Sequence, residues 1–157
     1  MLNYRLVKKD AFLVSGKKIV TTHENNLAQT EIPKFWDAFN QSEDSKTLCS
    51  MTMDERTLGI CYDLKKDGSF SYMIGIKTKT ELQGFESMLI PASTWAVFES
   101  IGPMPHSIQN IWQKIFNDFL VNSPYMHAPM ADFESYSKGD VNAADYYAEV
   151  WIPILKK

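Results

Sequence analysis

Two glutamates near the end of the chain lie in aromatic stretches where a carboxylate could do chemistry. Glu134 stands in Phe-Glu-Ser-Tyr, and alternation along a strand puts it on one face with Tyr136. If that face is turned inward, the charge must be paired, neutralised by a bound cation or hydrogen-bonded to hydroxyls such as those of Tyr72, Tyr136 or Tyr146. Glu134 is therefore either the acid of a pocket or a solvated glutamate at a sheet edge.

Glu149 stands in Tyr-Ala-Glu-Val-Trp and raises the same question. Alternation puts it with Tyr147 and Trp151, on the face opposite to Tyr146. Both faces cannot line one pocket, so the sequence leaves open which glutamate is the dominant acid.

Signatures of common enzymes are missing from the rest of the sequence. There is no GxSxG, HExxH or glycine-rich phosphate loop, and His23, His106 and His127 have spacings that suit no metal site. Cys49 and Cys61 form no CxxC pair, so we expect two reduced thiols. The sequence predicts neither a metal nor a cofactor.

Composition restricts the partners of this chain. It has 157 residues, 45% of them hydrophobic, which suits one ordinary globular domain. A net charge of -3 and a pI near 5.6 argue against direct binding to nucleic acid. No apolar run approaches the ~20 residues of a membrane span, so we expect a soluble, cytoplasmic protein. The aromatic content of 13% exceeds what packing needs and favours a cavity lined by rings.

Hydrophobic periodicity and turn residues give the elements that must position these side chains. Residues 4–20 predict a bent or hairpin-paired strand region broken by Ser-Gly-Lys-Lys, and 41–55 predict a surface loop. A helix over 31–40 would be capped by Thr30, and a second would follow Ser107, bury Ile108, Ile111, Trp112, Ile115, Phe116 and Phe119, and stop at Asn122. Strands are expected in pairs at 58–64 with 70–76, 85–91 with 94–100, and 132–137 with 146–154.

The two halves of the chain, about 1–79 and 80–157, repeat the same order of strand, strand, helix, strand, strand. Trp36 and Trp112 on the two helices are 76 positions apart, which indicates an internal duplication. We expect an α+β fold in a single domain over 1–157. It would have one continuous curved antiparallel sheet, both helices on one face, and a ligand groove between the helices.

An ordered set of motifs resembles the GyrI-like small-molecule-binding domain over about residues 2–155. This is also the effector-binding domain of AraC-type and multidrug-responsive bacterial transcription regulators. The motifs are Ile-Pro-Lys-Phe-Trp at 32–36, Leu-Gly-Ile-Cys-Tyr-Asp at 58–63, Ile-Pro-Ala-Ser-Thr-Trp-Ala-Val-Phe at 90–98, Ile-Trp at 111–112, Phe-Glu-Ser-Tyr at 133–136 and Ala-Glu-Val-Trp-Ile-Pro-Ile at 148–154.

The resemblance implies a stand-alone domain that senses or sequesters amphipathic, cationic aromatic molecules, with a link to transcription regulation. It implies that Glu134 is the acid of the pocket and that the rings of Tyr72 and Tyr146 stack on the ligand. The other residues that it implies as lining the pocket are Trp36, Trp112, Tyr136, Tyr62, Leu58 and Ile60. Some members of the family carry an aromatic residue where this chain has Leu58, which weakens one wall. A homodimer or a protein partner is a further expectation.

Two other functions stay open at this stage. Some single-domain relatives resemble hydrolases of electrophilic compounds, in which Glu134 would act as general base and Tyr72 or Tyr136 would donate a proton. The namesake of the family inhibits DNA gyrase by binding protein. The residues favour binding over catalysis.

Overall fold

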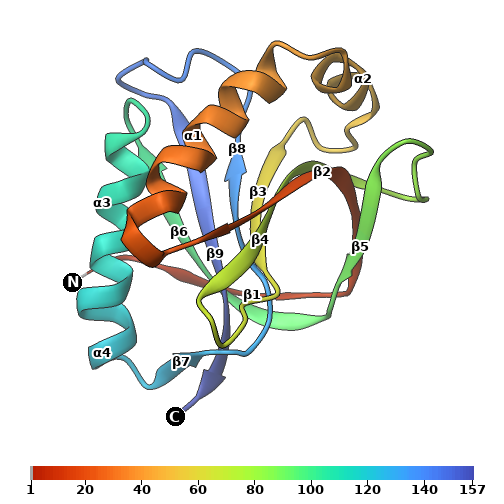
Figure 1. Ribbon diagram of the computed structural model, residues 1–157. Helices are drawn as coiled ribbons and strands as arrows, with labels where there is room; N and C mark the ends of the chain where they lie inside the picture. Colours follow the sequence, from red (N-terminus) through yellow and green to blue (C-terminus); the bar gives the residue numbers. More distant parts are fainter. Residues whose placement is uncertain (1) are drawn as a thin grey trace. The chain divides into compact units, whose positions relative to one another are not determined.

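The computed structural model describes residues 2–157, which divide into two compact units. The terminal unit consists of residues 2–11 and 91–157, and the inserted unit consists of residues 12–90. Each unit carries its own strands, helices and core (Figure 1). None of the helices within 2–157 combines the length and the apolar character that crossing a membrane requires.

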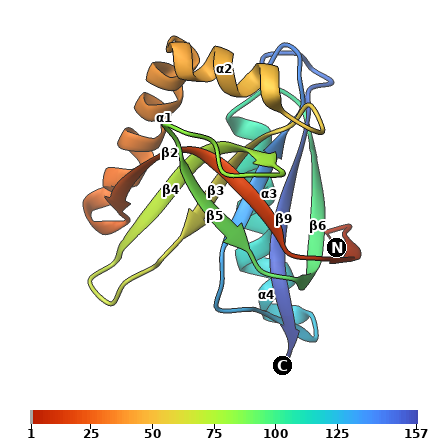
Figure 2. The same cartoon turned by 90° about the vertical axis from the view of Figure 1, so that its right-hand side faces the viewer.

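The inserted unit holds four antiparallel strands in the order β3, β4, β2, β5. Strand β2 pairs with both β4 and β5 (Figure 2). The strands are β2 (Phe12–Thr22), β3 (Thr57–Tyr62), β4 (Ser69–Thr78) and β5 (Glu86–Ile90). The 3-10 turn η1 (Glu24–Asn26) leads into the helices α1 (Leu27–Asn40) and α2 (Glu43–Met51).

The terminal unit orders its antiparallel strands β1, β6, β9, β8, and β7 pairs with the end of β9. These are β1 (Arg5–Lys9), β6 (Ser93–Ile101), β7 (Tyr125–His127), β8 (Asp132–Tyr136) and β9 (Tyr147–Lys156). One helical stretch packs on them through β6 and β9 (Figure 1). It runs from α3 (His106–Lys114) through the π-helix η2 (Ile115–Phe119) to α4 (Leu120–Asn122).

Several expectations from the sequence are confirmed. The fold is α+β with antiparallel strands. The hairpin around Asp67-Gly68 pairs β3 with β4, and β8 pairs with β9 as predicted. The second helix stops at Asn122, before a proline at 124. Cys49 and Cys61 are not joined by a disulfide.

The first helical region differs from the prediction. Helix α1 begins at Leu27, one turn before the predicted cap at Thr30. The segment 41–55 is not a loop, because it forms α2. Ser42 caps this helix by accepting a hydrogen bond from the amide of Ser45 at 3.2 Å, and Leu48 anchors it in the core. Ser42 followed by Glu43 and Asp44 is a typical start of a helix, which the polar composition of this segment did not indicate.

The predicted turn at Ser15-Gly16 is also wrong, because β2 runs through it without a break. Gly16 and Gly75 are direct partners across β2 and β4. A Cβ atom on Gly16 would lie 2.1 Å from the carbonyl oxygen of Ile74, and one on Gly75 would lie 2.5 Å from that of Ser15. These glycines therefore permit a close approach of two backbones rather than a turn.

The predicted hairpin of 85–91 with 94–100 does not form, because each of its strands pairs with a segment near the start of the chain. Strand β1 pairs with β6, from Lys9 opposite Ser93. Strand β5 pairs with β2, from Phe12 opposite Ile90, instead of with β6. The chain therefore passes between the units only at 11–12 and 90–91. The duplication of 1–79 and 80–157 stays a prediction.

Candidate functional site

Glu134 on β8 is half-buried, and both of its carboxylate oxygens accept hydrogen bonds from aromatic side chains. The indole Nε1 of Trp112 donates to Oε2 at 2.8 Å, and the hydroxyl of Tyr136 donates to Oε1 at 2.9 Å. These two donors fix the orientation of the carboxylate without removing its charge. The structure thus brings three predicted site residues together in the terminal unit; we call them the Glu134 cluster.

Local structure explains how the Glu134 cluster forms. Glu134 and Tyr136 are two residues apart on β8 and share one face, as the period of two predicts. The hydrogen bond from Trp112 shows that this face is the one toward α3. Trp112 lies on α3 and packs against the core of the terminal unit. Phe116, one turn further along the helix, stacks on Trp112 with ring centroids 5.5 Å apart and an interplanar angle of 21°.

Tyr146, another predicted site residue, belongs to the core of the terminal unit and is buried. Its hydroxyl donates to the backbone carbonyl oxygen of Ser137 at 2.6 Å. This bond closes the connection between β8 and β9. Its contacts within the terminal unit therefore give Tyr146 a structural role.

In the inserted unit the structure joins two predicted residues, Trp36 on α1 and Tyr72 on β4. The indole Nε1 of Trp36 donates to the hydroxyl of Tyr72 at 2.9 Å. Phe35 meets the Tyr72 ring edge-on at 6.5 Å, and Tyr72 is only 2% exposed. This pair is therefore an aromatic element of the inserted unit's core.

Leu58, Ile60 and Tyr62 do not join Tyr72. Cys61 lies directly opposite Tyr72 in the pairing of β3 with β4, and opposite residues share a face. Alternation then places Leu58, Ile60 and Tyr62 on the other face of β3. The register therefore separates these three from Tyr72, contrary to their grouping in one predicted pocket.

Glu149 lies on the face of β9 that points away from the Glu134 cluster, as alternation predicted. Its carboxylate accepts hydrogen bonds from Arg5 Nη2 at 2.7 Å, Tyr147 Oη at 2.7 Å and Trp151 Nε1 at 3.1 Å. Burial raises the pKa of Glu149, but the bonds from Arg5, Tyr147 and Trp151 outweigh burial and hold the pKa below its ordinary value. Burial and the Glu149 carboxylate raise the pKa of Tyr147 to about 12. Arg5 thus gives Glu149 a structural role that sequence reasoning missed.

His127 in β7 is held at both ring nitrogens by acceptors. Nε2 lies 2.9 Å from Asp132 Oδ2, and Nδ1 faces the backbone carbonyl oxygen of Ala128. Burial by itself would lower the pKa of His127, but Asp132 and the carbonyl of Ala128 raise it above the ordinary value of 6.5. The protonated ring satisfies both acceptors, so it is the form that stabilises the fold.

We expect the free energy of unfolding to fall, on the order of 1 kcal/mol, as the pH rises from 6 through the raised pKa of His127. The sign follows because a raised pKa in the folded state gives stability below pH 6.5 that is lost on deprotonation. Urea unfolding between pH 6 and 9 measures it. Asp132→Asn should remove this pH dependence, whereas His106→Gln, at an exposed histidine, should retain it. An unchanged profile in Asp132→Asn would contradict the assignment.

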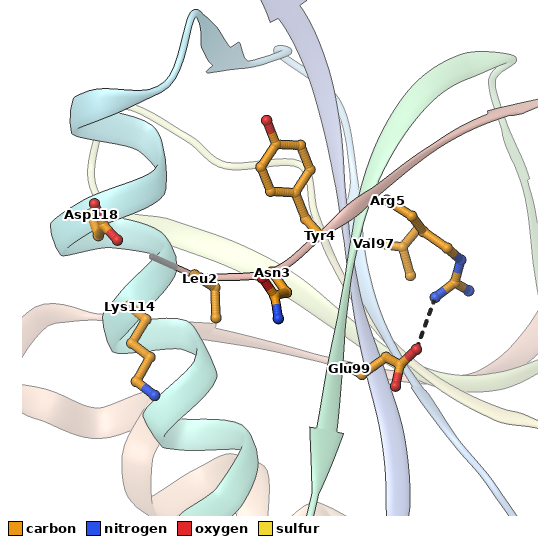
Figure 3. A pocket seen from close by; sticks show the side chains of 8 residues that line it. All are labelled: Leu2, Asn3, Tyr4, Arg5, Val97, Glu99, Lys114 and Asp118. Atoms are coloured by element: carbon orange, nitrogen blue, oxygen red, sulfur yellow. Dashed lines mark ion pairs between the residues drawn. The ribbon is translucent and has the colours of Figure 1, made fainter.

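A separate hollow of about 680 Å³ lies at the start of the chain, beside β6 and the helix (Figure 3). It contains no residue that the sequence predicted for a site. Two cations, Arg5 and Lys114, are balanced by two anions, Glu99 and Asp118. Arg5 and Glu99 already form an ion pair at 3.7 Å. The lining of this hollow thus mixes cations and anions, whereas the Glu134 cluster holds one carboxylate between aromatic donors.

The described residues contain no group of three or more His, Cys, Asp or Glu side chains placed to hold a metal ion. The arrangement that can act chemically is therefore a fixed, charged carboxylate among aromatic rings. Such an arrangement binds positive charge and apolar surface together.

Comparison with known proteins decides the family. The Cass2 family, described as integron-associated effector binding protein, matches residues 5–154. The chain belongs to this effector-binding family. The match covers both units, and it confirms the resemblance to the GyrI-like domain. A comparison with curated protein sequences gives no significant match.

Solved structures share the fold of this effector-binding domain. SAV2435 bound to tetraphenylphosphonium has 23% identity and a TM-score of 0.89, over 98% of this chain and 94% of its own. The integron cassette protein VCH_CASS2 from Vibrio cholerae has 21% identity and a TM-score of 0.73, over 97% and 95%. EcmrR in a complex with DNA has 17% identity and a TM-score of 0.68, over 99% of this chain and 58% of its own.

Proposed function

We propose that this effector-binding domain binds amphipathic cations that carry aromatic rings, with Glu134 as the charge partner. The observation that carries the proposal is the pair of hydrogen bonds that Trp112 and Tyr136 donate to the two oxygens of Glu134. A carboxylate that is oriented before the ligand arrives loses little entropy on binding.

The Glu134 cluster combines a negative charge with aromatic rings, which suits a ligand that carries a positive charge and rings of its own. The Glu134 carboxylate supplies the negative charge, and its two hydrogen bonds already come from the protein. A cation without N–H donors therefore suits it, because such a ligand needs charge and contact area rather than acceptors. The faces of Trp112 and Tyr136 add cation–π attraction of about 0.5 to 2 kcal/mol each.

Relatives support both parts of this proposal. The family is one of effector-binding proteins, and SAV2435 is a fold relative seen with tetraphenylphosphonium, a cation carrying four phenyl rings. EcmrR, another fold relative, is seen on DNA. We therefore propose that the chain acts as a sensor or sequesterer of such cations, and that any link to transcription follows from ligand binding.

Glu134→Gln should weaken the binding of tetraphenylphosphonium by about 1 to 4 kcal/mol, the Coulomb energy of two unit charges about 4 Å apart at effective dielectric constants of about 80 and 20. The glutamine oxygen can still accept from Trp112, and its amide can donate to Tyr136, so the folded structure should lose less than about 1 kcal/mol. Calorimetric titration of both proteins, together with urea unfolding, measures the two effects separately.

The control is Glu99→Gln, which makes the same change in net charge at a half-exposed residue of the same unit. It should bind tetraphenylphosphonium like the wild type. Triphenylphosphine oxide, which keeps rings but has no charge, should bind both variants and the wild type equally. If Glu134→Gln binds the cation as tightly as the wild type does, Glu134 is not the charge partner.

A further inference from the structure

Phe116 differs from the other residues on the apolar face of the helix in its exposure to solvent. Periodicity predicts that it is buried with its neighbours, yet 56% of its surface is exposed. Ile115 and Phe119, on either side of it, are buried in the core. The terminal unit therefore leaves one large aromatic ring in solvent at this point of the helix.

Phe116 lies inside the π-helical turn. The amide of Leu120 donates to the carbonyl oxygen of Ile115, five residues earlier, so this turn holds one residue more than an α-helical turn. Within this turn Ile115 and Phe119 are buried, whereas Phe116 is exposed. Single π-turns are rare and are often found at functional sites.

The exposed ring continues the Glu134 cluster. Phe116 stacks on Trp112 at 5.5 Å, and Trp112 donates its indole N–H to Glu134. A chain of contacts therefore runs from the carboxylate through the indole to a phenyl ring that is 56% exposed.

We propose that Phe116 determines specificity in the cation site by offering a further ring surface to ligands with several aromatic groups. This inference rests on the proposed function. Glu134 sets the preference for charge, and Phe116 sets the preference for aromatic rings over alkyl groups. The two preferences are separable, because they belong to different side chains.

Phe116→Ala should weaken the binding of tetraphenylphosphonium about 2- to 12-fold, the equivalent of one aromatic pair. Binding of tetraethylammonium, which has the charge but no ring, should stay at the wild-type level. Phe116→Tyr, which keeps the ring, should bind tetraphenylphosphonium like the wild type. The matched control is Val121→Ala, at an equally exposed apolar position on α4, which should leave both affinities unchanged. Calorimetric titration with both cations gives the ratio for each variant.

The outcomes separate this inference from the function on which it rests. If the wild type binds neither cation, both proposals fail. If the wild type binds tetraphenylphosphonium through Glu134 but Phe116→Ala binds it equally well, only the role of Phe116 is overturned. An equal loss for both cations in Phe116→Ala also overturns it, because a ring contact would not act on tetraethylammonium.

Discussion

Gly16→Ala should lower the free energy of unfolding by about 3 kcal/mol or more, through a single methyl group. The added Cβ would lie 2.1 Å from the carbonyl oxygen of Ile74 and 2.6 Å from the Cα of Gly75. Both are backbone atoms of β4, so no side-chain rotation relieves the overlap. Strands β2 and β4 would have to separate where they are hydrogen-bonded on both sides of the glycine pair.

Urea unfolding of the two proteins, extrapolated linearly, measures this loss. The control is Val20→Ala on the same strand, where the side chain is 62% exposed and the change should stay within about 0.5 kcal/mol. Gly75→Ala should resemble Gly16→Ala, because its Cβ would meet the carbonyl oxygen of Ser15 at 2.5 Å. If the free energy of unfolding of Gly16→Ala is within 1 kcal/mol of the wild-type value, β2 and β4 can separate at this point at little energetic cost.

Arg5→Ala should cost about 2 to 4 kcal/mol of stability, because it leaves the carboxylate of Glu149, 7% exposed, without its cation. We expect less than for a fully buried pair, since the Arg5 side chain is 46% exposed and partly solvated. Glu99→Gln is the control. Glu99 lies 3.7 Å from Arg5 and is half-exposed, so its loss should matter little.

A second substitution and the pH test the cause of this loss. Arg5→Ala combined with Glu149→Gln should recover part of the stability, because the uncompensated charge is gone. The lowered pKa of Glu149 contributes stability above pH 4.5 that is lost as the pH falls through the folded pKa. Without Arg5 this loss in acid should shrink. If the double variant is less stable than Arg5→Ala alone, the buried charge is not the cause.

Faces of single strands could be predicted from the sequence, because alternation is a local property of the chain. Glu134 with Tyr136, and Glu149 with Tyr147, lie on the faces that a period of two assigns. The alternation did not predict which face of β8 packs against the helix. The hydrogen bond from Trp112 to Glu134 shows that it is the face of Glu134.

Pairing between strands could not be predicted, because it depends on segments far apart in the chain. Nothing in the sequence distinguishes Gly16 from a glycine in a turn, yet Gly16 is needed for the close approach of β4, which lies some sixty residues later in the chain. The Asp67-Gly68 turn was predicted correctly, since its partners adjoin it. The grouping of Ile60 with Tyr72 failed for a related reason, since a shift of one residue in register exchanges the faces.

Part of the candidate site was therefore within reach of the sequence and part was not. Glu134 and Tyr136 follow from one short motif. Regular helical periodicity assigns Phe116 to the core, so its exposure within the π-turn became known only from the structure. Arg5 required the pairing of β1 with β6, which no local pattern indicates.

The pairing of β1 with β6 also affects the order in which strands can pair while the chain is synthesised. Strand β1 leaves the ribosome first, but its partner β6 is made 84 to 92 residues later, from Ser93 opposite Lys9 to Val97 opposite Arg5. At about 5 to 20 residues per second, β1 waits about 4 to 18 s without its partner. All the strands that pair within residues 12–90 are synthesised before β6. The nascent chain can thus finish its inserted unit while the strand that carries Arg5 is still unpaired.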